Sequence, residues 1–229
     1  MSLILNIDTA SEKAHVSFAN DGKVISVLYS NLQKEHASFV QSAIQQLEKN
    51  TGIVLSKIDA VAVTAGPGSY TGLRVGMASA KGICYALQKP LIAIKTLEMM
   101  AASAILFLKE TDNDLLLCPM MDARRMEVFT AIYKQSLQIV LEPCAMILDE
   151  MSFKNELLEK EILFFGNGSF KWEKICINKN ARFRHIENEP EALSTLSNKY
   201  FLKNNFASLA YSEPFYLKEF QFVNPDKKY

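Results

Sequence analysis

Apolar positions in the first part of the chain predict a β-meander followed by an amphipathic helix. Leu3 to Thr9, Ala14 to Asn20 and Lys23 to Ser30 have the pattern of short strands. Asn20-Asp21-Gly22, between the last two, is a typical hairpin turn. From Gln33 to Asn50 the apolar residues recur every three or four positions, which is the period of a helix.

A continuous apolar run and a glycine-rich turn come next. Ile58 to Ala65 predicts a buried strand, and Gly66-Pro67-Gly68 directly after it predicts a tight turn. A second helix starts near Thr71 and ends before Pro90, and Leu91 to Ile94 is a short strand. This succession indicates a mixed sheet covered by helices, because crossovers of this length favour parallel pairing of the later strands.

The same plan starts again further along the chain. A helix from Thr96 to about Lys109 precedes a second predicted meander. Its three strands are Leu115 to Asp122, Glu127 to Lys134 and Leu137 to Leu141. The later elements are a helix near Met151 to Glu159, a strand from Ile162 to Phe165, a turn from Gly166 to Ser169 and a helix from Glu191 to Lys203.

We therefore expect an α/β protein with two similar halves. The N-terminal half covers residues 1–108 and contains the glycine turn and the two amphipathic helices. The C-terminal half covers residues 109–229, and its terminal segment from Phe215 to Tyr229 could pack back on the first half. A chain of 229 residues is long enough for two small domains that share an interface.

Composition and charge indicate a folded, soluble, cytoplasmic protein. Hydrophobic residues make up 49% of the chain and charged residues 22%, and the formal net charge of 0 gives no general attraction to nucleic acid phosphates. The start MSLILNIDTA has no secretory signal, and no apolar run approaches the roughly 18 residues of a membrane span. The cysteines lack a CxxC pair, as is typical of reduced thiols. They are Cys84, Cys118, Cys144 and Cys176.

The segment from Gly66 to Arg74 reads GPGSYTGLR and is the strongest candidate for a binding site. Glycines between a strand and a helix expose backbone N–H groups beside the positive end of a helix dipole, which suits an anion. The segment matches neither the GxxxxGK[ST] nor the GxGxxG nucleotide motif, so a turn that allows close packing of helix on sheet is the favoured alternative. The candidate anion-binding residues are Asp8, Gly66, Gly68, Ser69, Gly72 and Arg74, the last as a bidentate donor.

Four segments, in this order, resemble the TsaB family, formerly called YeaZ. They are the strand from Ile4 to Ala10, the GPGSYTGLR turn, Ala80-Lys81-Gly82, and the stretch DARRMEVF from Asp122 to Phe129. Tyr70 and Phe129 differ from the family pattern only by exchange of one aromatic residue for another. The resemblance implies the actin, Hsp70 and sugar-kinase (ASKHA) fold, with two duplicated α/β halves and mixed sheets.

Two positions argue against catalysis by this chain. The catalytic paralogue in this superfamily carries a metal-binding HxxxH pair, but Thr96 and Met100 stand at the matching positions, and neither is a suitable ligand. In this fold an acidic residue at the end of the first strand usually faces a metal-bound phosphate. The turn after Asp8 lacks the glycine needed to wrap around a phosphate, so a structural cap is its favoured role. The histidines offer no helical metal-binding pair and are His15, His36 and His185.

Enzymatic alternatives stay open at this stage. Ser69 lies in a segment that is similar to a nucleophile elbow, although the GxSxG spacing is wrong. With His36 as its base, Ser69 would make a glycoprotease-like hydrolase. Asp8 and the glycine turn would instead make a kinase-like phosphotransferase.

Without chemistry of its own, the chain would act through its surface. The resemblance implies that the two amphipathic helices pair with their counterparts on a paralogous, TsaD-like transferase subunit. The same surface would support a homodimer when the chain is alone. Packing on the sheet already explains Val40, Ile44 and Leu47. The candidate interface residues are His36, Phe39, Met77, Lys81 and Tyr85.

The resemblance as a whole implies a non-catalytic subunit that is required for threonylcarbamoyl transfer to the adenosine next to the anticodon of tRNA. A TsaE-like ATPase subunit would take part in the cycle. No intrinsic cofactor or metal is expected, and ATP and Mg would bind to partner subunits or at the interface. Because the formal net charge is 0, tRNA would be reached indirectly, with another subunit supplying most of the contact.

Overall fold

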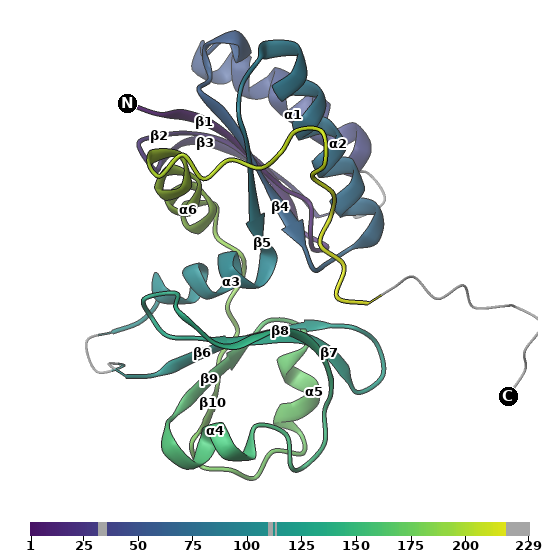
Figure 1. The fold of residues 1–229 in the computed structure, drawn as a ribbon, viewed down its shortest axis with the longest axis vertical. Coiled ribbons are helices and arrows are strands. Elements are labelled where there is room, and N and C mark those ends of the chain that lie inside the picture. Colours follow the sequence, from purple (N-terminus) through teal and green to yellow (C-terminus); the bar gives the residue numbers. More distant parts are fainter. Residues whose placement is uncertain (32–35, 110–111, 113, 219–229) are drawn as a thin grey trace, which may run out of the picture.

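The computed structural model describes residues 1–31, 36–109, 112 and 114–218, and the first half is built on a mixed five-stranded sheet (Figure 1). Its strand order is β3-β2-β1-β4-β5, in which β1 pairs antiparallel with β2 and parallel with β4. The strands are β1 (Leu3–Asp8), β2 (Ala14–Asn20), β3 (Lys23–Ser30), β4 (Ala60–Gly66) and β5 (Leu91–Lys95). Asp21 and Gly22 form the predicted hairpin turn with φ angles of 48° and 79°. The predicted mixed sheet is confirmed.

The second half repeats this plan. Its sheet has the order β10-β9-β6-β7-β8, with β6 antiparallel to β7 and parallel to β9. The strands are β6 (Leu116–Asp122), β7 (Glu127–Tyr133), β8 (Ile139–Ile147), β9 (Ile162–Phe165) and β10 (Ala181–Phe183). Each sheet thus has a three-strand meander extended by two parallel strands, which confirms the duplicated α/β fold.

Helices cover both faces of each sheet (Figure 1). The helices are α1 (His36–Thr51), α2 (Tyr70–Leu87), α3 (Thr96–Ile105), α4 (Lys154–Glu159), α5 (Ser169–Glu173) and α6 (Pro190–Leu202), with a short 3₁₀ helix, η2 (Leu55–Lys57). One face of the first sheet packs against α1 and α2, through side chains such as Ile44 and Met77. The opposite face packs against α3 and α6, and the outer face of the second sheet packs against α4 and α5.

Helix α3 lies between the two sheets (Figure 1). Met99 and Ala102 pack with the first sheet, whereas Leu97 and Met100 pack with the second. A helix that is buried on two sides needs apolar residues around most of its circumference, which explains the sequence Thr96-Leu-Glu-Met-Met-Ala-Ala-Ser-Ala-Ile105. It ends at Ile105, four residues before the predicted end at Lys109.

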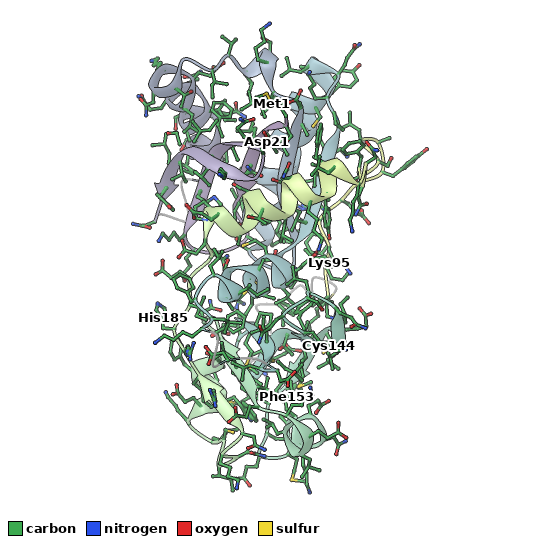
Figure 2. All side chains as sticks on the ribbon, turned by 90° about the vertical axis from the view of Figure 1, so that its left-hand side faces the viewer. Met1, Asp21, Lys95, Cys144, Phe153 and His185 are labelled. Carbon is green, nitrogen blue, oxygen red and sulfur yellow. The ribbon has the colours of Figure 1, made fainter. Side chains whose placement is uncertain are left out.

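The chain returns to the first half after β10 (Figure 2). Helix α6 contacts β1, β3 and β5. The following segment, residues 207–218, is here called the strap; it begins at Ala207, which bridges to Leu91, and Phe215 N–H donates to the Ala65 carbonyl at 2.6 Å. The predicted return of residues 215–229 is described only as far as residue 218, and the predicted helix start at Gln33 also lies outside the described residues.

The prediction and the structure differ at three further places, β8, α5 and β10. β8 extends to Ile147 rather than Leu141, because it is a half-exposed strand whose polar residues and Pro143 weaken the apolar pattern. The turn predicted at Gly166 to Ser169 leads into α5, and β10 had no prediction; both elements are only a few residues long. No helix in the described part of the chain is long and apolar enough to cross a membrane.

Replacement of the Leu97 side chain tests the role of α3. Leu97 is fully buried, so Leu97→Ala is expected to lower the free energy of unfolding by about 2–5 kcal/mol in urea denaturation. Leu158→Ala is the matched control, because Leu158 lies on α4 with 71% of its surface exposed, and its effect should stay within about 0.5 kcal/mol. Equal effects of the two variants would contradict the central position of α3.

Candidate functional site

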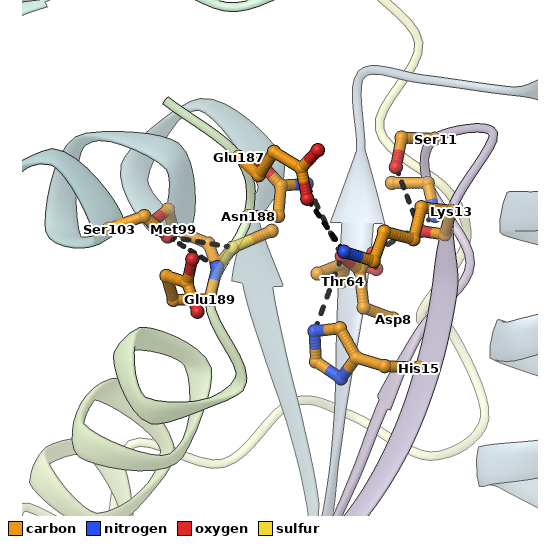
Figure 3. Close-up of polar contacts among 11 residues, drawn as sticks. Asp8, Ser11, Lys13, His15, Thr64, Met99, Ser103, Glu187, Asn188 and Glu189 are labelled. Atoms are coloured by element: carbon orange, nitrogen blue, oxygen red, sulfur yellow. Dashed lines mark hydrogen bonds and ion pairs between the residues drawn. The ribbon is translucent and has the colours of Figure 1, made fainter. Parts of the chain in front are cut away.

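Asp8 is buried at the end of β1, where its carboxylate is used within the protein (Figure 3). Oδ1 accepts hydrogen bonds from the Ala10 N–H at 3.0 Å and the Thr64 hydroxyl at 2.7 Å. Oδ2 accepts a longer bond of 3.4 Å from the Asn188 amide. Asp8 thus holds the β1–β2 turn, β4 and the segment that connects the two halves, as a structural cap would.

His15 lies opposite Asp8 in the β1–β2 register and is 1% exposed. Its Nε2 is 3.7 Å from Asp8 Oδ2, and neither ring nitrogen has a hydrogen-bond partner in the described residues. Burial lowers the pKa of His15, with the Asp8 carboxylate acting in the opposite direction. The imidazole is therefore neutral at neutral pH. Sequence reasoning gave His15 no role, although the register of the predicted meander would have paired it with Asp8.

The connection between the halves is tied to both the first sheet and α3 (Figure 3). Lys13 Nζ lies 2.6 Å from Glu187 Oε2, and this hydrogen bond raises the pKa of Lys13 and lowers that of Glu187. Glu189 N–H donates to the Ser103 hydroxyl at 3.0 Å. The protein's own side chains therefore span the space beside Asp8.

The glycine turn packs directly on the β1–β2 turn. Ser69 N–H donates to the Ala10 carbonyl at 2.7 Å, and a Cβ atom on Gly68 would lie 2.3 Å from that oxygen. A Cβ on Gly72 would lie 2.0 Å from the Thr9 carbonyl. The Ser69 hydroxyl caps α2 by accepting from Gly72 N–H at 3.2 Å. Glycine is thus needed for close approach of backbone to backbone, and Ser69 serves as a helix cap.

The strap covers the other side of the glycine turn (Figure 1). A Cβ on Gly66 would lie 2.4 Å from the Phe215 carbonyl, and Gly66 has a φ of 118° that favours glycine. Arg74 lies 4.1 Å above the Tyr70 ring and donates from Nε to the Tyr216 hydroxyl at 3.3 Å. The structure thus brings the predicted anion-binding residues together, and other parts of the same chain contact them, although the Arg74 side chain stays exposed.

The predicted interface residues do not share one surface. Tyr85 is 80% exposed on α2, and Phe39 is half-buried at the edge of the core. Met77 was also predicted to lie at the interface, but in this structure its side chain is 3% exposed and packs inside the first core. Lys81 donates to the Ala210 and Ser212 carbonyls and so holds the strap. His36 begins α1, and its side chain is outside the described part of the chain.

An open groove of about 490 Å³ lies between α1 and α2. Small side chains form much of the α2 side of this groove, and at Gly82 an added Cβ would meet no atom within 4 Å. Its lining residues are Gln41, Leu55, Ala78, Ser79, Gly82, Ile83, Ala86 and Leu87. Gly82 is therefore a helical glycine that the packing of this chain does not require.

No group of histidine, cysteine and carboxylate side chains in the described residues is arranged to hold a metal. Thr96 and Met100, at the positions of the HxxxH pair, are both buried. All four cysteines are free, and burial raises the pKa of the Cys84 thiol to about 11.

The fold places this chain among the actin-like and sugar-kinase-like proteins. It matches the polyphosphate/ATP-glucomannokinase of an Arthrobacter strain with a TM-score of 0.50 at 9% identity, over 89% of this chain and 100% of that one. A Pseudomonas aeruginosa protein described as similar to the peptidase YeaZ matches with a TM-score of 0.82 at 22% identity, over 95% and 100% of the two chains. These likenesses define the ASKHA fold.

Sequence comparison narrows the class to one family. Residues 27–228 match the family model for TsaD, tRNA N6-adenosine threonylcarbamoyltransferase. The Bacillus subtilis tRNA threonylcarbamoyladenosine biosynthesis protein TsaB is 31% identical over 72% of this chain and 70% of its own length. The chain belongs to the TsaB (YeaZ) family, within the wider group that the TsaD model describes.

Replacement by alanine at two glycines of α2 is expected to change the free energy of unfolding in opposite directions. Gly72→Ala is expected to lower the free energy of unfolding by about 1–3 kcal/mol or more, because its Cβ would collide with the Thr9 carbonyl. Gly82→Ala should raise it by about 0.5–1 kcal/mol, because alanine favours the helix and space is free. Urea denaturation of both variants measures the difference. Stabilisation by Gly72→Ala would contradict the close approach of the two turns.

The burial of His15 is expected to make the stability of the protein depend on pH. Because its pKa in the folded state is lowered from 6.5, the unfolded chain binds more protons below that pH. Stability present at neutral pH should therefore be lost as the pH falls below about 6.5 toward the lowered folded-state pKa, by up to about 1.4 kcal/mol per unit. His15→Gln should remove this part of the slope in urea denaturation between about pH 5.5 and about pH 7.5.

The matched control for this titration is His185→Gln, because the His185 side chain is 70% exposed. This variant should keep the pH dependence of the parent chain. If the stability curves of the two variants coincide, the buried imidazole is not the source of the slope.

Proposed function

We propose that this chain is a non-catalytic scaffold subunit in the formation of threonylcarbamoyladenosine on tRNA. Membership of the TsaB family assigns the chain to this biosynthesis. Within it, the chain binds and activates a paralogous TsaD-like transferase that modifies the adenosine next to the anticodon.

The α1–α2 surface is the observation that carries this proposal. It combines an open groove, a helical glycine with free space and the 80% exposed Tyr85. An exposed mid-helix glycine costs about 1 kcal/mol of stability relative to alanine, and it allows another helix to approach closely. An aromatic side chain beside such a surface is suited to anchoring a protein partner.

The internal contacts of the glycine turn support the absence of catalysis. Asp8 is held by Ala10, Thr64 and Asn188, and Ser69 caps α2. Arg74 is engaged by two tyrosines of the same chain. A hydrolase or kinase would need these groups to face a substrate.

Other members of the assembly follow from the same proposal. A TsaE-like ATPase subunit takes part in the cycle, and ATP and Mg bind to partner subunits or at the interface. Two copies of this chain pair through the α1–α2 surface when the transferase is absent, because a surface that fits a paralogue can also fit itself.

The test is reconstitution from the purified transferase, the ATPase subunit, ATP, tRNA and a source of threonylcarbamoyl adenylate as the activated group donor, scored for the modified adenosine. The reaction should require this chain. It should survive Ser69→Ala and Asp8→Asn in this chain, because neither group acts on substrate. Gly82→Gln should reduce transferase binding by about tenfold or more, since a long side chain would prevent close approach.

Thr195→Gln is the control for the interface variant. Thr195 is exposed on α6, which covers the sheet face opposite α1 and α2, so transferase binding should be unchanged. If the adenosine is modified equally well without this chain, the scaffold proposal is contradicted. Loss of modification with Ser69→Ala, while the complex still forms, would favour the hydrolase alternative.

A further inference from the structure

Basic side chains gather where the strap passes from the first half to the second, although the net charge of the whole chain is 0. Phe215 lies beside Lys95, Tyr216 beside Arg74, and Lys218 beside Glu127 at the start of β7. Lys95 marks the junction of the two halves in Figure 2, where His185 lies on the other side. The basic side chains of this region, here called the basic band, are Arg74, Lys95, Arg124, Arg125, Lys171 and Lys218.

The strap sets the size of the basic band. Residues 215–218 are consecutive, so their Cα atoms span at most about 10 Å. Leu217 packs with the core of the second half, which keeps this stretch on the protein. Arg74 contacts Tyr216, and Glu127 at the start of β7 contacts Lys218. Arg74 and the β6–β7 turn are therefore separated only by the length of this short segment and lie on the same side of the molecule.

The carboxylates of this region are too few to neutralise its basic side chains. Asp122 accepts from Lys171 Nζ at 2.5 Å, and Glu127 lies 2.8 Å from Lys218 Nζ. Glu213, on the strap, is exposed. Among the described residues of this region, these three acidic groups lie beside six basic ones, so this part of the surface is positive in a chain whose formal net charge is 0.

The β6–β7 turn presents two arginines in an unusual backbone conformation. Arg124 and Arg125 are exposed and have φ angles of 74° and 49°. The turn is fixed by Arg124 N–H, which donates to Asp122 Oδ1, and by Glu127 N–H, which donates to the Arg124 carbonyl. Within the described residues, neither guanidinium has an ion-pair partner. Packing explains Asp122 and Glu127 of the DARRMEVF stretch but not its arginines.

Aromatic rings lie among these charges. Tyr216 is 39% exposed and its ring centre is 5.4 Å from that of Tyr70, while Phe215 lies under Lys95. Basic groups interleaved with partly exposed rings suit RNA, because phosphates pair with guanidinium groups and unpaired bases stack on aromatic or guanidinium planes. An acidic protein surface would use the charges but would not need the rings.

We propose that the basic band binds the phosphate backbone of RNA directly, with Arg124 and Arg125 as its principal phosphate contacts. The inference rests on the proposed function, which makes tRNA the RNA concerned. It replaces the expectation that this chain meets tRNA only through other subunits. A formal net charge of 0 for the whole chain does not reveal such a local excess of basic residues.

The test measures tRNA affinity of the assembled complex with the transferase over a range of salt concentrations. Arg124→Ala with Arg125→Ala should weaken binding about tenfold and reduce the slope of log affinity against log salt by about 1.4–1.8, as expected for two lost phosphate contacts. Arg124→Lys with Arg125→Lys keeps both charges and should keep most of the slope. Circular dichroism and the midpoint of urea denaturation check that each variant is folded.

Lys23→Ala with Lys199→Ala is the matched control, since both lysines are exposed and lie near the β2–β3 turn and the end of α6. This variant should bind tRNA like the parent chain. An unchanged salt slope in the arginine variant overturns the inference, and if the same variant loses a protein partner, the band is a protein interface. A complex that does not form, or modification that does not need this chain, counts against the proposed function instead.

Discussion

The burial of α3 between two sheets is the constraint on which the rest of the structure depends. Its residues face both cores, with Met99 and Ala102 on one side and Leu97 and Met100 on the other. A shared apolar helix removes water from two sheet faces at once, so neither half can bury its inner face without the other. The two halves are therefore fixed as one unit, and the segments that cross between them have defined end points.

Two segments of the chain cross between the halves that α3 holds together. The connection at Glu187 to Glu189 is tied to Lys13, Asp8 and Ser103, and the strap runs from the glycine turn to Glu127. Together they occupy the surroundings of Asp8 and the glycine turn with the protein's own groups. The parts that in a kinase-like fold would face a phosphate thus serve to join the halves. The α1–α2 surface and the basic band, which we propose as binding surfaces, lie outside these contacts.

Most of the fold could be predicted from the sequence because its strands and helices are strongly patterned. The first meander, the buried β4 strand and the helix after the glycine turn follow from local periodicity and turn residues. The weak elements are β8, which is half-exposed, and β10, which is only 3 residues long, so their patterns carry little information. The burial of Met77 could not be predicted, because periodicity gives the apolar face of a helix without saying which neighbours cover it.

Local sequence determined the elements, the duplicated α/β plan, the family and the need for glycine between β4 and α2, because these depend on residues close together in the chain. Tertiary structure alone decided how the candidate site is used. The contacts of Asp8 with Asn188, Arg74 with Tyr216 and Lys81 with Ser212 join positions more than a hundred residues apart. Such contacts arise from packing of the two halves around α3, and no local pattern in the sequence encodes them.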